Sequence, residues 1–304
     1  MFKLGFKVNA LLSKHGWKAG AGNGWDTAAT VRELRFWHDQ GYEAVELLPD
    51  HYTGLGDVFT FTDDEWIRTR KVVEEAGLAF YGVLGWRRMV FREPWVAEKA
   101  ADLEKIAHIS ELLGIKVIDI LTAYPMPITP AAGGPARRLF RSLWDATTSD
   151  FEIAAAWLKQ YARRVAGFGA SIALEMHPDC LTDIPLSTLR LMSMIGEPNV
   201  GVNPDTFDNE WIYPEYPEYM VPTAAKQCQI LAPHVVYWHA KNWRRGLGPD
   251  GQWQFFRTHL DEGDQPIEVM VQNLVDVGYN GAVILECGRG FEYSTSAATL
   301  RRSC

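Results

Sequence analysis

The stretch Ser171-Ile-Ala-Leu-Glu-Met-His-Pro-Asp179 is an apolar run that ends in a carboxylate and an imidazole two residues apart. Alternate residues of a β-strand point to the same face. If this run is a strand, Glu175 and His177 leave its C-terminal end side by side. Three later stretches have the same form, an apolar run followed by a side chain that can bind metal. They are 199–205, 235–239 and 281–286.

The rest of the chain repeats the order apolar strand, turn, amphipathic helix. Seven further strands are predicted at 4–10, 43–48, 78–84, 115–121, 199–203, 235–241 and 282–287. Helices are predicted at 26–40, 62–76, 94–113, 150–168, 185–195, 223–231 and 266–277, with a short one within 288–304. Alternating strands and helices favour a parallel sheet, and eight such units in one domain over 1–304 predict an α/β fold, the (β/α)8 TIM barrel.

The sequence leaves one alternative fold open and contains three long loops. A doubly wound open sheet is the alternative fold, but the run Gly20–Gly24 comes well after the first strand and lacks the GxGxxG spacing. Long loops are expected at 122–148, 208–222 and 242–265, and long loops in compact domains are usually functional or mobile.

Composition excludes several classes of function. The 304 residues carry a formal net charge of −8, and phosphate binding needs a basic surface, so we expect no nucleic-acid partner. No apolar run approaches the roughly 20 residues that span a bilayer, and no signal peptide is evident, so we expect no membrane partner and a cytoplasmic location. The four scattered cysteines indicate neither a disulfide framework nor a cysteine zinc site.

Four residues that can bind metal each end a predicted strand, on the side of the barrel where such enzymes carry out chemistry: Glu175, Asp205, His239 and Glu286. Each residue alone is more simply a solvated side chain, a helix N-cap or a core histidine. Their joint occurrence at four strand ends predicts one divalent metal, because three carboxylates in a dry pocket need positive charge. Mn²⁺ is the preferred ion, with Mg²⁺, Co²⁺ and Zn²⁺ as alternatives.

Several motifs in order carry a resemblance to a known family. They are Gly41-Tyr-Glu-Ala-Val-Glu46, Ala173-Leu-Glu-Met-His177, Val202-Asn-Pro-Asp-Thr-Phe207, Trp238-His-Ala-Lys-Asn242, Leu260-Asp-Glu-Gly-Asp264, Gly278-Tyr-Asn-Gly281 and Ile284-Leu-Glu286. Over most of its length the chain resembles the xylose-isomerase-like TIM barrels, the sugar phosphate isomerase and epimerase superfamily. The resemblance implies that the four residues bind one divalent metal. In the epimerase branch the residues that match Glu175 and Glu286 are also the acid/base pair of an enediolate mechanism.

The resemblance also implies residues that bind a sugar or glycoside substrate. Arg245 matches a substrate-binding arginine of the epimerases, and Arg244 is the alternative. Lys241 should share a face with His239 and reach substrate, unless it forms an ion pair at the barrel rim. Asp208 stands where the epimerases carry a histidine, which argues against a standard free-ketose epimerase.

His177 points to a second branch. The Glu-x-His pattern resembles the catalytic subunits of C-glycoside deglycosidases, which act on 3-oxo-glycosides by proton abstraction and β-elimination and assemble with a small β-rich subunit. A histidine beside a metal can act as a general base near neutral pH. Its alternative role is to orient Glu175 by a hydrogen bond.

Four functions are therefore weighed. The first is a metal-dependent isomerase or epimerase that removes a proton next to a carbonyl of a sugar or keto-sugar. The second is a lyase of the same fold, such as a C-glycoside deglycosidase subunit or an inosose-type dehydratase. A DNA-repair endonuclease of related fold would need a basic groove and extra histidine ligands, and the fourth function is a non-catalytic binding subunit. Both a homo-oligomer and a hetero-oligomer with a small β-rich subunit remain open.

Overall fold

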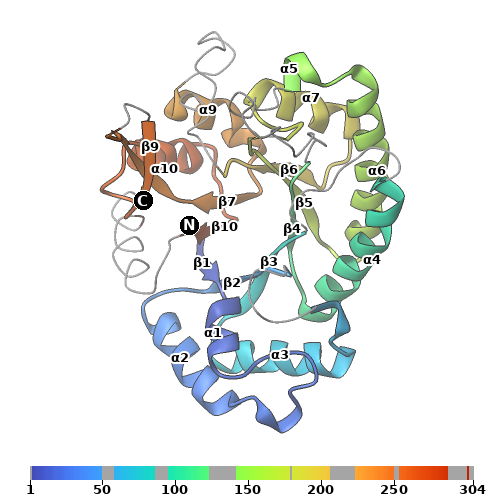
Figure 1. The fold of residues 1–304 in the computed structure, drawn as a ribbon, viewed down its shortest axis with the longest axis vertical. Helices are drawn as coiled ribbons and strands as arrows, with labels where there is room; N and C mark the ends of the chain where they lie inside the picture. The colour runs from blue at the N-terminus through green and yellow to red at the C-terminus, as the bar shows by residue number, and fades with distance from the viewer. Residues whose placement is uncertain are drawn as a thin grey trace.

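Eight parallel strands form one sheet, and helices alternate with them along the chain. The structure is a computed structural model that describes residues 2–49, 58–85, 95–122, 142–178, 180–205, 223–249, 253–286 and 300. Figure 1 shows the strands at the centre of the molecule and the helices around them. The predicted (β/α)8 barrel is confirmed.

The barrel strands follow the order β6-β5-β4-β3-β2-β1-β10-β7 around the sheet. Their bounds are β1 Lys3–Lys7, β2 Ala44–Leu47, β3 Ala79–Leu84, β4 Val117–Ile120, β5 Ser171–Glu175, β6 Val200–Asn203, β7 Tyr237–Ala240 and β10 Ala282–Leu285. Strand β1 pairs with both β2 and β10, which joins the two ends of the chain in one sheet. In the described part of the chain, β6 meets the segment before β7 through one parallel bridge, Val202–Val235, which closes the ring.

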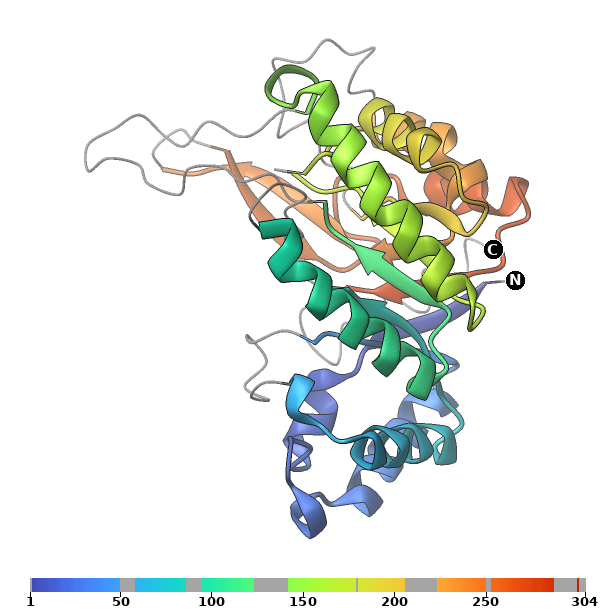
Figure 2. The ribbon, with the colours of Figure 1, turned by 90° about the vertical axis from the view of Figure 1, so that its right-hand side faces the viewer.

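The helices cover the outside of the barrel, as two perpendicular views show (Figures 1 and 2). They are α1 Asn9–Lys14, α2 Thr27–Asp39, α3 Asp63–Glu75, α4 Trp95–Leu113, α5 Ser142–Asp145, α6 Thr148–Ala166, α7 Pro185–Ile195, α9 Ala224–Leu231 and α10 Ile267–Asp276. Short 3-10 turns occupy Gly22–Gly24, Val58–Thr60 and Ala232–His234. None of the helices in these ranges is long and apolar enough to cross a membrane.

Local sequence signals explain where several helices begin. The Thr62 side chain accepts a hydrogen bond from the Glu65 backbone, and the Glu65 carboxylate accepts one from the Thr62 backbone. This reciprocal capping box satisfies amide groups that the first turn of a helix leaves without partners. Asp26 caps α2 through a single hydrogen bond, which its carboxylate accepts from Ala29 N at 2.9 Å. Both helix starts are those that the sequence predicts.

The structure differs from the sequence prediction at two places that matter for the site. The loop expected at 242–265 contains an antiparallel hairpin of β8 Asn242–Leu247 and β9 Trp253–Thr258, which projects away from the barrel strands (Figure 2). The intervening Gly248-Pro-Asp-Gly251 is a turn sequence that favours such a reversal. In addition, β5 ends at Glu175, so the strand period that placed His177 beside Glu175 does not extend to His177.

The closure of the ring generates a prediction about Gly201. A Cβ atom at this position in β6 would lie 2.6 Å from the His234 carbonyl oxygen and would also overlap the Val236 side chain. Because backbone atoms move aside less readily than side-chain ends, we expect Gly201→Ala to lower the free energy of unfolding by about 1–3 kcal/mol. Urea denaturation measures this change. Gly24→Ala is the control, since a Cβ there would meet no atom within 4 Å, and equal losses in both variants would contradict the prediction.

Candidate metal centre

Strand β7 places three polar side chains in a row inside the barrel. Tyr237 and His239 alternate along the strand, and Lys241 follows two residues later. Alternate strand residues share a face, and all three side chains are buried. The row therefore forms three levels, with His239 between a tyrosine on one side and a lysine on the other.

On one side of the His239 ring lie two of the predicted ligands. Its Nδ1 atom is 3.6 Å from Glu175 Oε1, at the end of β5, and 3.5 Å from Asp205 Oδ1, just after β6. Donors about 2.0–2.2 Å from one cation, at tetrahedral or octahedral angles, lie roughly 2.9–3.6 Å apart. The spacing of these three residues therefore fits a single divalent cation.

The hydrogen bonding of these side chains supports the same fit. In the described residues, His239 Nδ1, Glu175 Oε2 and Asp205 Oδ1 are buried and have no hydrogen-bond partner. A buried polar atom without a partner costs about 1–3 kcal/mol. Two carboxylates and an imidazole are also a suitable donor set for a hard or borderline divalent ion. These residues therefore fit the metal that the sequence predicts.

The barrel interior carries more acidic than basic side chains. Five carboxylates face two lysines and one histidine: Glu46, Asp119, Glu175, Asp205 and Glu286 against Lys7, Lys241 and His239. Burial, and then the charge of Glu175, raises the pKa of Asp119 well above its ordinary value. Burial, and then Asp205, likewise raises the pKa of Glu175, although His239 and His177 oppose the rise. Protons or a cation must supply the missing positive charge.

Glu286, the fourth predicted ligand, is bound by lysines instead. Lys241 Nζ donates to Glu286 Oε2 at 2.6 Å and to Asp205 Oδ2 at 2.7 Å, and Lys7 pairs with the other Glu286 oxygen. Burial would raise the pKa of Glu286, but Lys241 and Lys7 outweigh it and hold the pKa well below its usual range. Lys241 would have to release Glu286 before Glu286 joined the cluster, so its role as a ligand stays a prediction.

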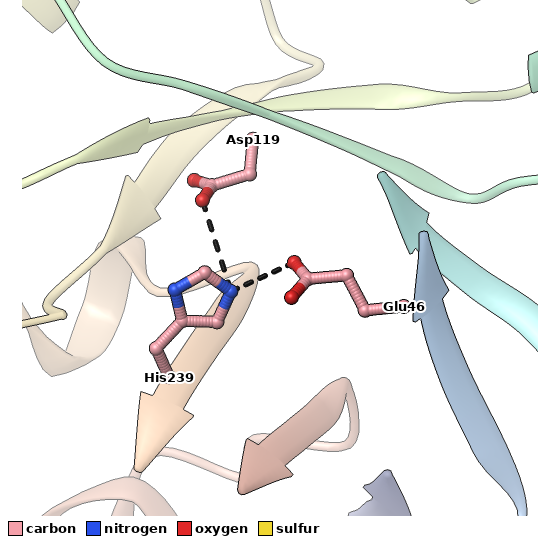
Figure 3. A group of neighbouring side chains, drawn as sticks. All are labelled: Glu46, Asp119 and His239. Carbon is pink, nitrogen blue, oxygen red and sulfur yellow. Dashed lines mark hydrogen bonds and ion pairs between the residues drawn. The ribbon is translucent and has the colours of Figure 1, made fainter. Parts of the chain in front are cut away.

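On the other side of the His239 ring lie two carboxylates that sequence reasoning missed. His239 Nε2 lies 2.8 Å from Glu46 Oε1 and 3.8 Å from Asp119 Oδ2. Figure 3 shows both carboxylates pointing toward this nitrogen. Asn203 joins the two sides, because its amide donates to Asp119 Oδ2 at 3.1 Å and accepts from the His239 backbone at 2.9 Å. The available signal was a lone acidic residue inside an apolar strand, Glu46 in β2 and Asp119 in β4.

His177 lies next to this centre, half-buried and beyond the end of β5. Its Nδ1 atom is 2.8 Å from the Pro178 carbonyl oxygen. A carbonyl oxygen only accepts hydrogen bonds, so Nδ1 is the donor, and in the neutral ring the lone pair lies on Nε2. His177 therefore presents a basic nitrogen near Glu175.

The structure does not bring the other predicted substrate-binding residues into contact with the described residues of the metal centre. Arg244 and Arg245 are exposed on β8, where Arg244 donates to the Glu262 carbonyl and the Arg245 backbone donates to Asp264 at 2.8 Å. Asp208 lies outside the described residues. The substrate-binding roles of Arg244, Arg245 and Asp208 stay predictions.

A cavity of about 460 Å³ lies away from the carboxylates, at the opposite end of the barrel. It is lined by residues at the N-terminal ends of strands, including Tyr81, Ser171 and Gly281. None of the acidic or basic residues of the metal centre lines it. The side chains that can do chemistry therefore lie at the carboxylates and not in this cavity.

Comparison with known proteins agrees with this architecture. A sequence model described as a xylose isomerase-like TIM barrel matches residues 34–303. A search of curated proteins found no match. A xylose isomerase-like TIM barrel protein from Mycobacterium smegmatis in complex with magnesium is 16% identical, with a TM-score of 0.69 over 99% of this chain and 94% of that one.

Two further solved structures share the fold at a similarly low sequence identity. A probable 3-DHS dehydratase, AsbF, from Bacillus anthracis is 16% identical, with a TM-score of 0.68 over 99% of both chains. An L-ribulose 3-epimerase is 14% identical, with a TM-score of 0.68 over 100% of this chain and 94% of that one. At these identities the likeness is one of fold.

The lysine contacts generate a prediction about stability. Lys241→Met removes the ammonium group shared by two buried carboxylates, so we expect the metal-free protein to lose about 3–5 kcal/mol of unfolding free energy in urea. The control is Lys3→Met, which breaks an exposed ion pair with Glu43 and should change stability by about 0.5 kcal/mol or less. An unchanged stability of Lys241→Met would contradict the assignment of Lys241 as their compensating charge.

Proposed function

The chain belongs to the xylose isomerase-like TIM barrel family, and we propose that it is a metal-dependent enzyme that removes a proton next to the carbonyl of a sugar or keto-sugar. The observation that carries the proposal is the set of unpaired donor atoms on Glu175, Asp205 and His239, buried beside a histidine with a basic nitrogen. A base that accepts the proton and a metal that stabilises the resulting negative charge would together support such a proton abstraction.

The proposed metal has a defined set of protein donors. Glu175, Asp205 and His239 would hold it, with Glu286 as a fourth ligand once Lys241 releases it. A divalent cation here would act as a Lewis acid, stabilising the negative charge that develops on the carbonyl oxygen as the enediolate forms. Mn²⁺ is the ion that we propose.

The chain's own residues supply the remaining steps. His177 Nε2 would accept the proton, because Nδ1 is already engaged with the Pro178 carbonyl. Lys241 lies between Asp205 and Glu286 and would donate a hydrogen bond to a substrate oxygen. Arg244, Arg245 and Asp208 are proposed to bind the sugar beyond the reacting carbons.

One observation favours a lyase as the second candidate. Two-base epimerisation needs a proton donor on the face of the sugar opposite the base. The ammonium groups of Lys7 and Lys241 hold Glu286 as a carboxylate, and this makes it a poor donor. In β-elimination a single base removes the proton and the C–H electrons form a C=C bond. The substituent leaves with the electron pair of the bond that breaks and takes up a proton from solvent. A 3-oxo-glycoside or an inosose would suit this reaction.

The lyase candidate also has a consequence for assembly. A C-glycoside deglycosidase subunit would function with a small β-rich partner chain, whereas an isomerase would function alone or as a homo-oligomer. We propose the hetero-oligomer only together with the lyase reaction.

The metal content of the protein tests the proposed centre. We expect the purified protein to hold about one equivalent of a divalent metal by elemental analysis, and Glu175→Gln to bind that metal at least tenfold more weakly. Glu33→Gln is the control, because Glu33 pairs with Lys14 away from the centre. An unchanged metal content in Glu286→Gln would remove Glu286 from the ligand set.

The proposed base generates the second prediction. General-base catalysis contributes about 10²–10⁴-fold in rate, so we expect His177→Asn to lose activity by that factor while retaining its metal. Deuterium uptake from D₂O into free ketoses, inososes and 3-oxo-glycosides, followed by NMR, measures proton abstraction directly. His108→Asn is the control, since His108 is exposed and pairs with Asp63. Exchange and turnover of free ketoses alone would contradict the lyase candidate.

A further inference from the structure

Glu46 accepts two hydrogen bonds deep inside the barrel. Its Oε1 atom is 2.8 Å from His239 Nε2 and 3.1 Å from the Tyr237 hydroxyl. All three side chains are essentially inaccessible to solvent. Glu46 comes from β2 and the other two residues from β7, so the contact spans the barrel interior.

Which nitrogen of a histidine binds a metal is set by the hydrogen bond that the other nitrogen makes. Glu46 faces Nε2, and the two candidate ligands Glu175 and Asp205 face Nδ1. The hydrogen bond from Nε2 therefore directs the lone pair of Nδ1 to the metal position. It also fixes the rotation of the imidazole ring.

We infer that Glu46 is a positioning residue of the metal centre, which holds Nε2 of His239 as the donor so that Nδ1 is the ligand. This inference rests on the proposed function, because it requires that a cation binds beside Nδ1. It assigns a role in the metal centre to Glu46, which is not one of the four predicted ligands.

Glu46 is itself held in place from several sides. The Tyr237 hydroxyl donates to Oε1, and Lys7 Nζ lies 3.8 Å from Oε2. Tyr237 stacks on Tyr81 with ring planes 2° apart, and a Cβ atom at Gly82 would overlap its hydroxyl. The glycine thus leaves the space through which Tyr237 reaches Glu46.

Asp119 lies on the same side of the His239 ring as Glu46 but is not hydrogen-bonded to it. Its Oδ2 atom is 3.8 Å from the same Nε2 and accepts a hydrogen bond from Asn203 instead. Glu46, Asp119 and Nε2 also offer a rival position for a cation on the opposite side of the ring. The 2.8 Å between Nε2 and Glu46 is a hydrogen-bond distance, whereas the 3.5 and 3.6 Å on the Nδ1 side match the spacing of two ligands.

The wild-type protein allows a direct test of the bonding of each ring nitrogen. With Zn²⁺ as the diamagnetic probe and ¹⁵N-labelled histidine, we expect the His239 ring to show a protonated Nε2 and a metal-bound Nδ1. His239→Asn identifies the signal by its loss. A metal-bound Nε2 would overturn the inference, and a wild-type protein that binds no metal would overturn the proposed function instead.

Substitutions at Glu46 and Asp119 distinguish the effect of the hydrogen bond to Nε2 from the effect of a buried negative charge. We expect Glu46→Gln to bind Zn²⁺ about 10–100-fold more weakly in a competition titration, and Tyr237→Phe to show a smaller loss. Asp119→Asn removes an equally buried carboxylate that is not hydrogen-bonded to Nε2, so its affinity should stay within about threefold of wild type.

The remaining outcomes also decide the question. Wild-type affinity in a folded Glu46→Gln would overturn the inference, with folding checked by circular dichroism. Equal losses in Glu46→Gln and Asp119→Asn would mean that charge alone matters and would overturn it as well. If Glu175→Gln kept its Zn²⁺ while Asp119→Asn lost it, the cation would lie on the Nε2 side, and Glu46 would be a ligand.

Discussion

The imidazole of His239 is the group on which the candidate site depends, because its two nitrogens serve two different sets of carboxylates. Nε2 donates to Glu46, and Nδ1 faces Glu175 and Asp205. A ring held on one nitrogen presents the other in a fixed direction, as metal sites require. Strand β7 carries Tyr237 and His239, and Lys241 follows directly after its last residue, so one short segment places three polar side chains in the barrel interior.

The second constraint is charge. Barrel interiors are usually filled by Val, Ile and Leu, yet this one contains five carboxylates and two lysines. Carboxylates out of water need a compensating charge or a proton. The lysines compensate Asp205 and Glu286, whereas Glu175 and Asp119 have raised pKa values instead. The demand for positive charge is therefore greatest around His239, because Glu175 and Asp119 lie on the two sides of its ring.

The fold was readable from sequence because its signals are local. The eight barrel strands are short apolar runs, and the starts of α2 and α3 are marked by Asp26 and by the pair Thr62 and Glu65. The hairpin of β8 and β9 was not predicted, although a turn sequence separates its strands. The side chains of β8 are mostly half-buried or exposed, so the alternation of buried and exposed residues that identifies a strand is weak there.

The sequence by itself determined the eight-strand barrel and the residue types at the strand ends, because strand period and side-chain chemistry are properties of short segments. It placed Glu175, Asp205 and His239 at one end of the barrel. Only the tertiary structure decided that Glu46, 193 residues from His239 along the chain, accepts from its ring, and that lysines bind Glu286. These pairings depend on strand register and on the closure of the ring, which bring together side chains from strands far apart in the sequence.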